Sequence, residues 1–529
     1  MKKTPQQYID AELAIKNGQI DKAIRLLDRL VDAAPLNISY RLKRGEAHFI
    51  KEDFQTGLRD FAKAVELDHK NIQAVINFGA ALIRCNQPHE AKEILDYALE
   101  LDPNSFDAYI NLCNVFQFLH KPDEALRSAM RAIEIRPDHF LAFNNLGTAL
   151  GDLNLINESR EAFQTAHELN PQYLPSIINL AQLHVKQAEY EKAQKLYEAA
   201  LTLKRITPFE SDLIRYYLSY LYLQKGMLAK GWDYYDLGFG PLLPVTALRS
   251  LRKFMQPRWD GNADLTKRLL VWREQGLGDE IEFSTCFADL LSTGMQITVE
   301  CDRRLLSIFQ RNYPTLNFRP ESVGADQMPL FDDFDVQIPV GSLPRIYRRD
   351  KANFDKQHTR WSVDSNLSYK FQQRLEPYKN KILVGICWRS GLLRVQRNES
   401  YSGLPDWKPL LQRNDIQFVN LQYGDCEDEL TAIEQELNIS ILRWPDIDLK
   451  DDLEAVIALI DQLDIVVTVG TAVSSLAGAV GKKCLLLAKR SWIFLGETER
   501  YPWYPTVHPL LVQDHELVAT RIPDAASMI

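Results

Sequence analysis

The chain has 529 residues, of which 46% are hydrophobic and 25% are charged, and its formal net charge is −9 at pH 7. This composition excludes an intrinsically disordered chain and gives enough length for about two to four folded domains. The negative charge and the interspersed basic residues argue against nucleic acid as the main partner, because phosphate binding needs a clustered basic surface.

The cysteines and the apolar runs indicate a cytoplasmic protein. The seven cysteines are scattered, odd in number and never paired as CxxC, so neither a disulfide framework nor a zinc site is predicted. The N-terminal segment has no apolar run behind its lysines, and no later stretch approaches the roughly 18 apolar residues that a membrane span needs. We therefore expect no membrane span and a cytoplasmic location.

Proline recurs at a fixed interval in the first two hundred residues. Pro103, Pro137 and Pro171 follow one another at intervals of 34 residues, and Pro35 lies two such intervals before Pro103. Since proline separates one helical hairpin from the next, this spacing predicts a series of 34-residue hairpins.

Small residues recur at the same interval inside each predicted hairpin. The three series are Ala23, Gly57, Ala91, Ala125, Ser159 and Ala193; Ala64, Ala98, Ala132, Ala166 and Ala200; and Gly45, Gly79 and Gly147. Small side chains let the two helices of a hairpin approach closely, and the large residues Phe61, Phe163 and Tyr197 are expected to fill the crossing.

These series resemble the tetratricopeptide repeat, with six units over 1–205 and a weaker seventh unit from about Asp212. Stacked repeats form a superhelix with a long concave wall, so we expect the array to bind a protein partner. The alternative is that the array only rigidifies or dimerises the chain.

After about Gly240 the sequence changes to short apolar runs that alternate with helical stretches. The first set of runs is Leu269–Trp272, Ile297–Glu300, Asn317–Arg319 and Val336–Pro339; the second is Ile382–Trp388, Phe418–Tyr423, Ile441–Trp444, Ile465–Val469 and Cys484–Leu487. This alternation predicts an α/β region of two parallel-sheet lobes, with a polar helical stretch at about Asn366–Lys379 between them. Ligands are expected where strands end and helices begin.

The first turn of chemical interest runs from Arg273 to Asp279. Gly276 and Gly278 allow a tight turn and a close approach of a ligand, and Asp279 stands at the start of the helical run Ile281–Leu291. The simpler interpretation is that Asp279 only caps this helix. The turn has too few glycines for a dinucleotide fingerprint and lacks the lysine of a P-loop.

Two further turns follow strands of the second predicted lobe. One consists of Gly470, Thr471, Ala472, Val473, Ser474 and Ser475. Its N–H groups and the positive end of its helix are suited to a phosphate, although close packing and a threonine cap explain the same residues. The other consists of Trp388, Arg389 and Ser390 with Arg397 following. An arginine there is suited to phosphate oxygens, and the alternative is a surface ion pair.

Several ordered motifs over about 255–510 resemble one family. They are RWDGNADLTKRLLVWREQGLGDEIEFS, VGICWRSG, FVNLQYGDCEDEL, DLKDDLEAVIALIDQLDIVVTVGTAVSSLAGAVGKKC and LGETERYPWYP. In this order they resemble the catalytic region of bacterial tetratricopeptide-repeat-linked glycosyltransferases. That family is related to the heptosyltransferases and has the GT-B fold of two Rossmann-like lobes.

The resemblance implies transfer of a sugar from a nucleotide-activated donor, which lies mainly on the C-terminal lobe. Asp279 matches the position proposed as general base, and Gly470 to Ser475 match the helix end that receives the donor phosphate. Arg389 and Ser390 match the loop facing these phosphates. Gln422 and Tyr423 match the loop expected beside the nucleoside. The branch of this family that shares the WRSG and YPWYP motifs includes enzymes that glycosylate flagellin in the cytoplasm, using the repeat array to hold the substrate protein.

The sequence also departs from this family pattern. Heptosyltransferase-like relatives usually carry Asp and His where this chain has Gly470 and Ser475, which argues against heptose as the sugar. Positions equivalent to Glu399 and Ser400 are commonly basic in close relatives, where they would form part of the phosphate clamp.

The resulting prediction has three domains: a repeat array over 1–245, a GT-B N-terminal lobe on the acceptor side over 246–365 and a C-terminal, nucleotide-sugar lobe over 366–529. The predicted activity is protein O-glycosylation of Ser or Thr, with flagellin as the expected acceptor. A non-catalytic scaffold and a transferase acting on a glycan or lipid remain as alternatives.

The sequence predicts no metal and no cofactor other than the nucleotide sugar as substrate. Asp446 and Asp448, like Asp333 and Asp335, have the DxD spacing that some sugar transferases use for a divalent cation. Both pairs lie in ordinary loop contexts, and the resemblance is to a metal-independent fold, so we expect structural or solvated carboxylates.

Overall fold

The structure is a computed structural model that describes residues 6–204, 206–239, 252–324, 327–354, 360–390, 401–513 and 516–529. Its contacts divide the chain into two compact units. The first unit is Met1–Val185 with Glu191–Leu203, and the second is Lys186–Tyr190 with Lys204–Ile529. Of the predicted site residues, Arg397 lies outside the described residues, as do Glu399 and Ser400.

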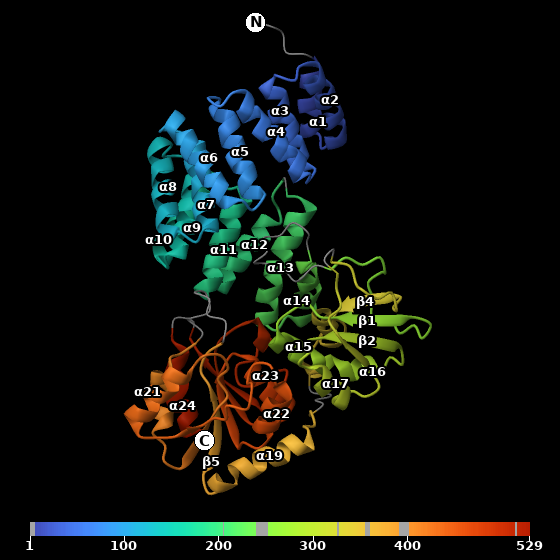
Figure 1. Ribbon diagram of the computed structural model, residues 1–529, viewed down its shortest axis with the longest axis vertical. Helices are drawn as coiled ribbons and strands as arrows, with labels where there is room; N and C mark the ends of the chain where they lie inside the picture. The colour runs from blue at the N-terminus through green and yellow to red at the C-terminus, as the bar shows by residue number, and fades with distance from the viewer. Residues whose placement is uncertain are drawn as a thin grey trace. The chain divides into compact units, whose positions relative to one another are not determined.

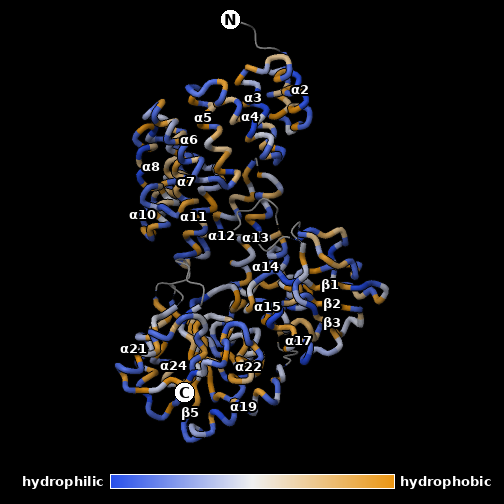
Figure 2. Tube along the Cα trace, in the orientation of Figure 1, coloured by the Kyte–Doolittle hydropathy of each residue, from blue (hydrophilic) through white to orange (hydrophobic). Residues whose placement is uncertain are grey.

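Helices in consecutive pairs make up the first unit (Figure 1, blue to green). They are α1 (Gln6–Lys16), α2 (Ile20–Ala33), α3 (Ile38–Ile50), α4 (Phe54–Leu67), α5 (Ile72–Arg84), α6 (Pro88–Leu101), α7 (Phe106–Phe118), α8 (Pro122–Ile135), α9 (Phe140–Asp152), α10 (Ile156–Leu169), α11 (Leu174–Lys186) and α12 (Tyr190–Ala200). Each of the four prolines of the predicted series lies in the turn that follows one pair. Figure 2 shows hydrophilic and hydrophobic residues alternating along these helices, as expected for helices with one buried face.

The small residues of the repeat series are buried in the packing between helices. Ala64, Ala98, Ala132, Ala166 and Ala200 are each 0% exposed. A Cβ atom on Gly147 in α9 would lie 2.6 Å from Cδ1 of Phe163 in α10, so this crossing has room only for glycine. The predicted hairpins and the role of Phe163 are confirmed.

A second feature repeats every 34 residues and was not predicted. The turn inside a helix pair contains a residue with positive φ at Glu52, Asn86, His120, Asn154 and Ala188, with φ between 53° and 66°. Gly18 holds the corresponding place in the first pair, with φ 73°. Only glycine adopts this conformation without cost, and asparagine tolerates it. The turn geometry is therefore preserved although its residue type is not.

The second unit opens with α13 (Pro208–Gln224) and α14 (Leu228–Tyr235). Thr207 begins α13 with a capping box, accepting a hydrogen bond from the N–H of Glu210. Trp232 of α14 is 0% exposed and donates from Nε1 to the carbonyl of Arg348, 2.9 Å away. The last helix pair therefore packs within the unit that holds the sheets.

The first sheet has four parallel strands in the order β3-β2-β1-β4. The strands are β1 (Arg268–Trp272), β2 (Gln296–Cys301), β3 (Asn317–Pro320) and β4 (Val336–Pro339), and the helices are α15 (Leu277–Phe283), α16 (Phe287–Leu291), α17 (Leu306–Asn312) and α18 (Leu343–Tyr347). All four predicted strands are present. The predicted helix 281–291 is split into α15 and α16, and α15 begins earlier, at Leu277.

The second sheet has six parallel strands in the order β10-β9-β8-β5-β6-β7. The strands are β5 (Ile382–Cys387), β6 (Ile416–Asn420), β7 (Ile441–Leu442), β8 (Ile465–Val469), β9 (Cys484–Lys489) and β10 (Val507–Val512), and the helices are α19 (Ser365–Leu375), α20 (Lys408–Leu411), α21 (Glu427–Leu437), α22 (Leu453–Asp461), α23 (Ala472–Ala479) and α24 (Ile522–Ser527). The predicted strand 418–423 was placed too late, because Leu421 to Tyr423 form the loop after β6. Strand β10 was missed because it contains Pro509, which an edge strand tolerates.

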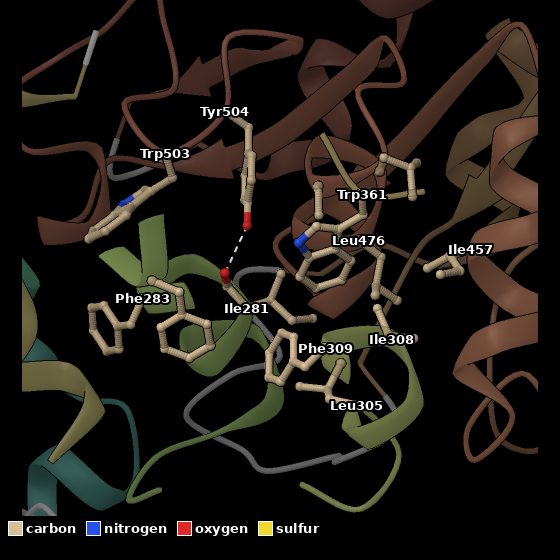
Figure 3. Packing of buried hydrophobic residues seen from close by; sticks show 14 of the residues in the cluster. Ile281, Phe283, Leu305, Ile308, Phe309, Trp361, Ile457, Leu476, Trp503 and Tyr504 are labelled. Carbon is tan, nitrogen blue, oxygen red and sulfur yellow. Dashed lines mark hydrogen bonds between the residues drawn. The ribbon is translucent and has the colours of Figure 1, made fainter. Parts of the chain in front are cut away.

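The two sheet regions share one hydrophobic core. Figure 3 shows Trp503 and Tyr504 from the C-terminal part packing against Ile281 and Phe283 of α15. The ring centroids of Phe283 and Trp503 are 5.5 Å apart, and the hydroxyl of Tyr504 donates to the carbonyl of Ile281 at 2.8 Å. These contacts hold α15 against the C-terminal segment that contains Trp503 and Tyr504. The two parallel sheets described above confirm the α/β prediction. Within the described ranges, no helix combines the length and apolarity required for a membrane span.

Candidate functional site

The turn that carries Asp279 follows β1 at a point where the strand order of the first sheet reverses. Strand β1 has β2 on one side and β4 on the other, and such a switch point is where open parallel sheets bind ligands. Gly276 is the N-cap of α15, and Asp279 lies half-buried in its first turn. A Cβ atom on Gly276 would lie 3.3 Å from Oδ2 of Asp279, so the carboxyl group folds back over the start of the helix.

The turn at Gly470 occupies the equivalent place in the second sheet, at the switch point between β8 and β5. Thr471 caps α23 by accepting a hydrogen bond from the N–H of Val473 at 3.3 Å, and Ser474 donates to the carbonyl of Thr471 at 2.7 Å. Gly470 is exposed, and a Cβ atom placed on it would meet no atom of the described residues within 4 Å. Among the described residues, none packs against the Cα atom of Gly470, just before α23 begins.

The starts of α15 and α23 lie side by side. A Cβ atom on Gly278 would lie 3.7 Å from Oγ of Ser475 and 3.8 Å from Cα of Ala472. The hydroxyl of Ser475 also donates to Oε1 of Glu282, across 3.1 Å. The two turns predicted to carry the base and the donor phosphate therefore adjoin, although they are nearly two hundred residues apart in the sequence.

The third turn, after β5, is braced by Gln422. Its Oε1 accepts hydrogen bonds from the backbone N–H groups of Trp388 at 3.1 Å and Arg389 at 2.9 Å, and its Nε2 donates to the carbonyl of Tyr423 at 3.0 Å. Gln422 is only 1% exposed. Its side chain shapes the loops at the ends of β5 and β6, whereas the sequence prediction placed it beside a nucleoside. Ser390 and Tyr423 lie within 3.4 Å of each other through their hydroxyl oxygens.

Arg389 is paired within the protein. Its guanidinium donates to the carbonyl of Asp425 at 2.6 Å and from Nε to Oε1 of Glu429 at 3.1 Å, and Trp388 Nε1 donates to the other oxygen of Glu429 at 2.7 Å. The ion-pair alternative named for this arginine is thus what the structure contains. A phosphate at this loop would have to compete with the carboxylate of Glu429.

Two carboxyl groups of α15 that the sequence analysis overlooked are buried beside Asp279. Glu280 and Glu282 are 2% and 5% exposed. Burial raises the pKa of Glu280 to about 7 against the opposing effect of Arg273, whose Nε donates to Oε2 of Glu280 at 2.8 Å. Burial also raises the pKa of Glu282 to about 8, and the nearby charge of Asp279 adds to this shift.

Tyr501 was also overlooked as a site residue, although YPWYP belonged to the motifs that showed the resemblance. Its buried hydroxyl donates to Oε1 of Glu282, and its pKa is raised well above the ordinary value of 10.0, first by burial and then by Glu282. The only sequence signal was a glutamate lying between the apolar residues Ile281 and Phe283, where a buried carboxyl group needs hydrogen-bond donors.

A charged cavity of about 440 Å³ opens at the carboxyl ends of β1, β2 and β3. Its lining includes three arginines and three carboxylates: Arg273, Arg303, Arg304, Asp302, Glu321 and Asp451. Such a lining favours a polar or charged group over an apolar one.

Three of the four DxD carboxylates, Asp333, Asp335 and Asp446, form ion pairs, and Asp448 accepts hydrogen bonds from the backbone N–H groups of Lys450 and Asp451. Asp446 pairs with Lys370 at 3.0 Å and Arg374 at 2.6 Å, and both cations lower its pKa. Asp335 pairs with Arg268 at 2.9 Å. Within the ranges that the structure describes, no group of three or more His, Cys, Asp or Glu residues could hold a metal ion.

The comparisons with known proteins identify the repeats. Models described as tetratricopeptide repeat match residues 11–71 and 176–209. Protein FlbA of Caulobacter vibrioides (strain ATCC 19089 / CIP 103742 / CB 15) is 31% identical over an alignment of 371 residues that covers 66% of this chain and 61% of FlbA. This chain therefore spans about three fifths of the length of that relative.

Solved structures of repeat proteins also match part of the chain. TTC0263, a thermophilic repeat protein of Thermus thermophilus, is 15% identical, with a TM-score of 0.31, over 32% of this chain and 92% of its own. A repeat protein from Parabacteroides merdae ATCC 43184 is 13% identical, with a TM-score of 0.37, over 40% of this chain and 82% of its own. The family models over residues 11–71 and 176–209, together with the helix pairs of the first unit, identify the N-terminal helices as tetratricopeptide repeats, and such repeats commonly bind other proteins.

Proposed function

We propose that this protein is a metal-independent glycosyltransferase of the GT-B type. It moves a sugar from a nucleotide-activated donor to a Ser or Thr hydroxyl of a protein held by the repeats. Flagellin is the acceptor suggested by the family resemblance of the motifs over 255–510. The observation that best supports the proposal is that the Asp279 turn and the Gly470 turn adjoin and that Gly470 is exposed.

Each half of the proposed reaction has a group suited to it. The N–H groups at the start of α23 and its positive end would neutralise the phosphate as the bond between sugar and nucleotide breaks. The acceptor oxygen attacks the anomeric carbon, its proton passes to the carboxylate of Asp279, and the nucleotide leaves with the bonding electron pair. The chemistry needs these two groups on opposite sides of one sugar-sized gap.

The repeat array supports a protein as the acceptor. A hydroxyl on a protein must be brought to the site together with its chain, and a repeat superhelix offers an extended surface for this task. Binding a glycan or lipid acceptor would not require the twelve helices of the repeat array, α1 to α12.

A non-catalytic scaffold is the competing candidate, and specific contacts favour it. Three side chains predicted to face the donor make hydrogen bonds within the protein: Arg389 with Glu429, Gln422 with the β5 loop, and Ser475 with Glu282. In a scaffold these contacts would be permanent. In a transferase the backbone N–H groups of α23 would carry most of the donor binding.

Gly470 provides a test of donor binding that leaves the packing intact. The full-length chain would be titrated with UDP-glucose, GDP-mannose and CMP-N-acetylneuraminate, and the change Gly470→Leu should weaken binding of the preferred donor at least about tenfold. The melting temperature should not change, because a Cβ atom at this position would meet no atom of the described residues within 4 Å. Gly470→Ala is the matched small variant and should have a lesser effect. No binding of any donor by the wild type would favour the scaffold.

The acceptor is tested separately by mass. Purified flagellin incubated with the protein and its preferred donor should gain one or more whole sugar masses in intact-mass spectrometry. Unchanged flagellin, together with consumption of the donor in the presence of another acceptor, would contradict the proposed acceptor and leave the transferase.

A further inference from the structure

Glu282 lies where the two sheet regions meet. It belongs to α15, yet its Oε1 accepts hydrogen bonds from Ser475 of α23, at 3.1 Å, and from the hydroxyl of Tyr501. These partners are 193 and 219 residues away in the sequence. One carboxyl oxygen thus joins three segments that surround the candidate site.

The surroundings of Glu282 favour its neutral form. Its side chain is buried, and the titratable groups facing it are Asp279 on the same helix and Tyr501 and Tyr504 from the C-terminal segment. Burial and the negative charge of Asp279 raise the pKa of Glu282, while hydrogen bonds from Tyr501 and Ser475 oppose the shift only in part. Two close carboxyl groups in such a place do not both ionise readily.

We propose that Glu282 is a positioning residue that holds the Asp279 turn of α15 against the start of α23. This inference rests on the proposed function, since it has Glu282 position both the proposed base, Asp279, and the proposed phosphate site at the start of α23. Asp279 and Glu282 are three residues apart on one helix and so lie on neighbouring parts of its surface. Ser475 lies in the first turns of α23, so the bond to Glu282 fixes both helix starts at once.

The direction of the pH dependence follows from the raised pKa. The folded protein holds a proton on Glu282 from its ordinary pKa of 4.5 up to about 8, whereas the unfolded chain has lost it. The stabilising contribution is therefore complete below pH 4.5 and is lost as the pH rises through about 8. Above that range two negative charges, on Glu282 and Asp279, lie close together on α15. Their repulsion should displace the Asp279 turn from α23, even though the hydrogen bonds from Ser475 and Tyr501 favour the ionised carboxylate.

Glutamine imitates a protonated glutamate and therefore provides the test. Full-length Glu282→Gln and Glu282→Ala would be compared with the wild type from pH 6 to pH 9.5, by melting temperature and by calorimetric affinity for inorganic pyrophosphate. We expect the wild-type affinity, relative to that of Glu282→Gln, to fall up to about tenfold by pH 9, because about a tenth of Glu282 is still protonated there. Glu282→Ala should bind weakly at every pH.

The matched control is Glu280→Gln, which alters a second buried carboxyl group of α15 that faces Arg273 instead of α23. This variant should keep the wild-type loss of affinity above pH 8, whereas Glu282→Gln should lack it and melt higher than the wild type at pH 8. If Glu282→Gln keeps the wild-type pH dependence in both measurements, the inference is overturned while the proposed function stands. A wild type that binds neither pyrophosphate nor any nucleotide sugar contradicts the proposed function and the positioning role together.

Discussion

The repeat array and the sheet region of this protein differ in how far apart in the sequence their contacting residues lie. In the array, the close crossing of α9 and α10 joins Gly147 and Phe163, which belong to one hairpin. In the sheet region, the bond between Glu282 and Ser475 spans 193 residues. A repeated local contact leaves a periodic trace in the sequence, whereas one long-range contact leaves none. The proposed reaction takes place in the sheet region, which depends on long-range contacts. The proposed acceptor binding takes place in the repeat array, which depends on local contacts.

Removing the repeats should have the largest effect on modification of a protein acceptor, because the sheet region would then act without the repeat array. The second unit begins at Lys204, apart from the short segment Lys186–Tyr190. A chain lacking residues 1–203 should lose all modification of a protein acceptor, measured by intact mass. It should still bind the nucleotide sugar with wild-type affinity, because α23 and the sheets keep their packing. Continued modification of flagellin by the shortened chain would show that the repeats do not hold the acceptor.

The next largest effect is expected from Asp279→Asn in the sheet region. Loss of a general base typically lowers turnover by about 10²- to 10⁴-fold, and donor affinity should change little. The measurement is the rate of sugar transfer together with donor binding and melting temperature. Asp264→Asn, in an exposed turn before β1, is the control and should leave the rate unchanged. Wild-type turnover by Asp279→Asn would remove Asp279 from the reaction.

The sequence predicts the repeat array more completely than the site in the sheet region, because the array depends on local contacts and the site on long-range contacts. The hairpins were predicted from the Ala64 series and Gly147, because each repeat places the same small residue at the same crossing. The strands were predicted because runs such as Ile465–Val469 are almost entirely apolar and β-branched, as buried parallel strands are. Two of the errors in the predicted strands came from local features, the proline in β10 and the loop at Leu421 to Tyr423.

The site was only partly predictable for a physical reason. Asp279 and Gly470 stand at strand ends, and the carboxyl ends of parallel strands are where ligands bind. Glu282 and Tyr501 could not be paired from the sequence, because their contact depends on how the two sheet regions pack. The pairing of Arg389 with Glu429 was likewise invisible, since arginine at a strand end fits both a phosphate and a carboxylate.

A larger side chain at the crossing of α9 and α10 should have a smaller effect than the changes above, and it should affect only the stability of the first unit. Gly147→Ala places a Cβ atom 2.6 Å from Phe163 and should lower the free energy of unfolding of the first unit by about 1–3 kcal/mol. The control is Gly151→Ala in the same helix, where the nearest atom, Oγ of Ser159, is 3.3 Å away. This control should be neutral or stabilising, because alanine favours the helix. Denaturant unfolding measures both, and equal effects would contradict the close crossing.

The smallest expected effect comes from the repeated turn with positive φ. Glu52 holds φ 66° with an exposed side chain, and a left-handed residue other than glycine costs roughly 1–2 kcal/mol. Because glycine also gives the unfolded chain more freedom, Glu52→Gly should stabilise the first unit by only about 0.5–1 kcal/mol. Glu93→Gly, an exposed change inside α6, should instead destabilise it by about 1 kcal/mol. The same substitution would then have opposite signs at two places in one repeat array. Loss of stability at both positions would mean that the turn does not require the left-handed conformation.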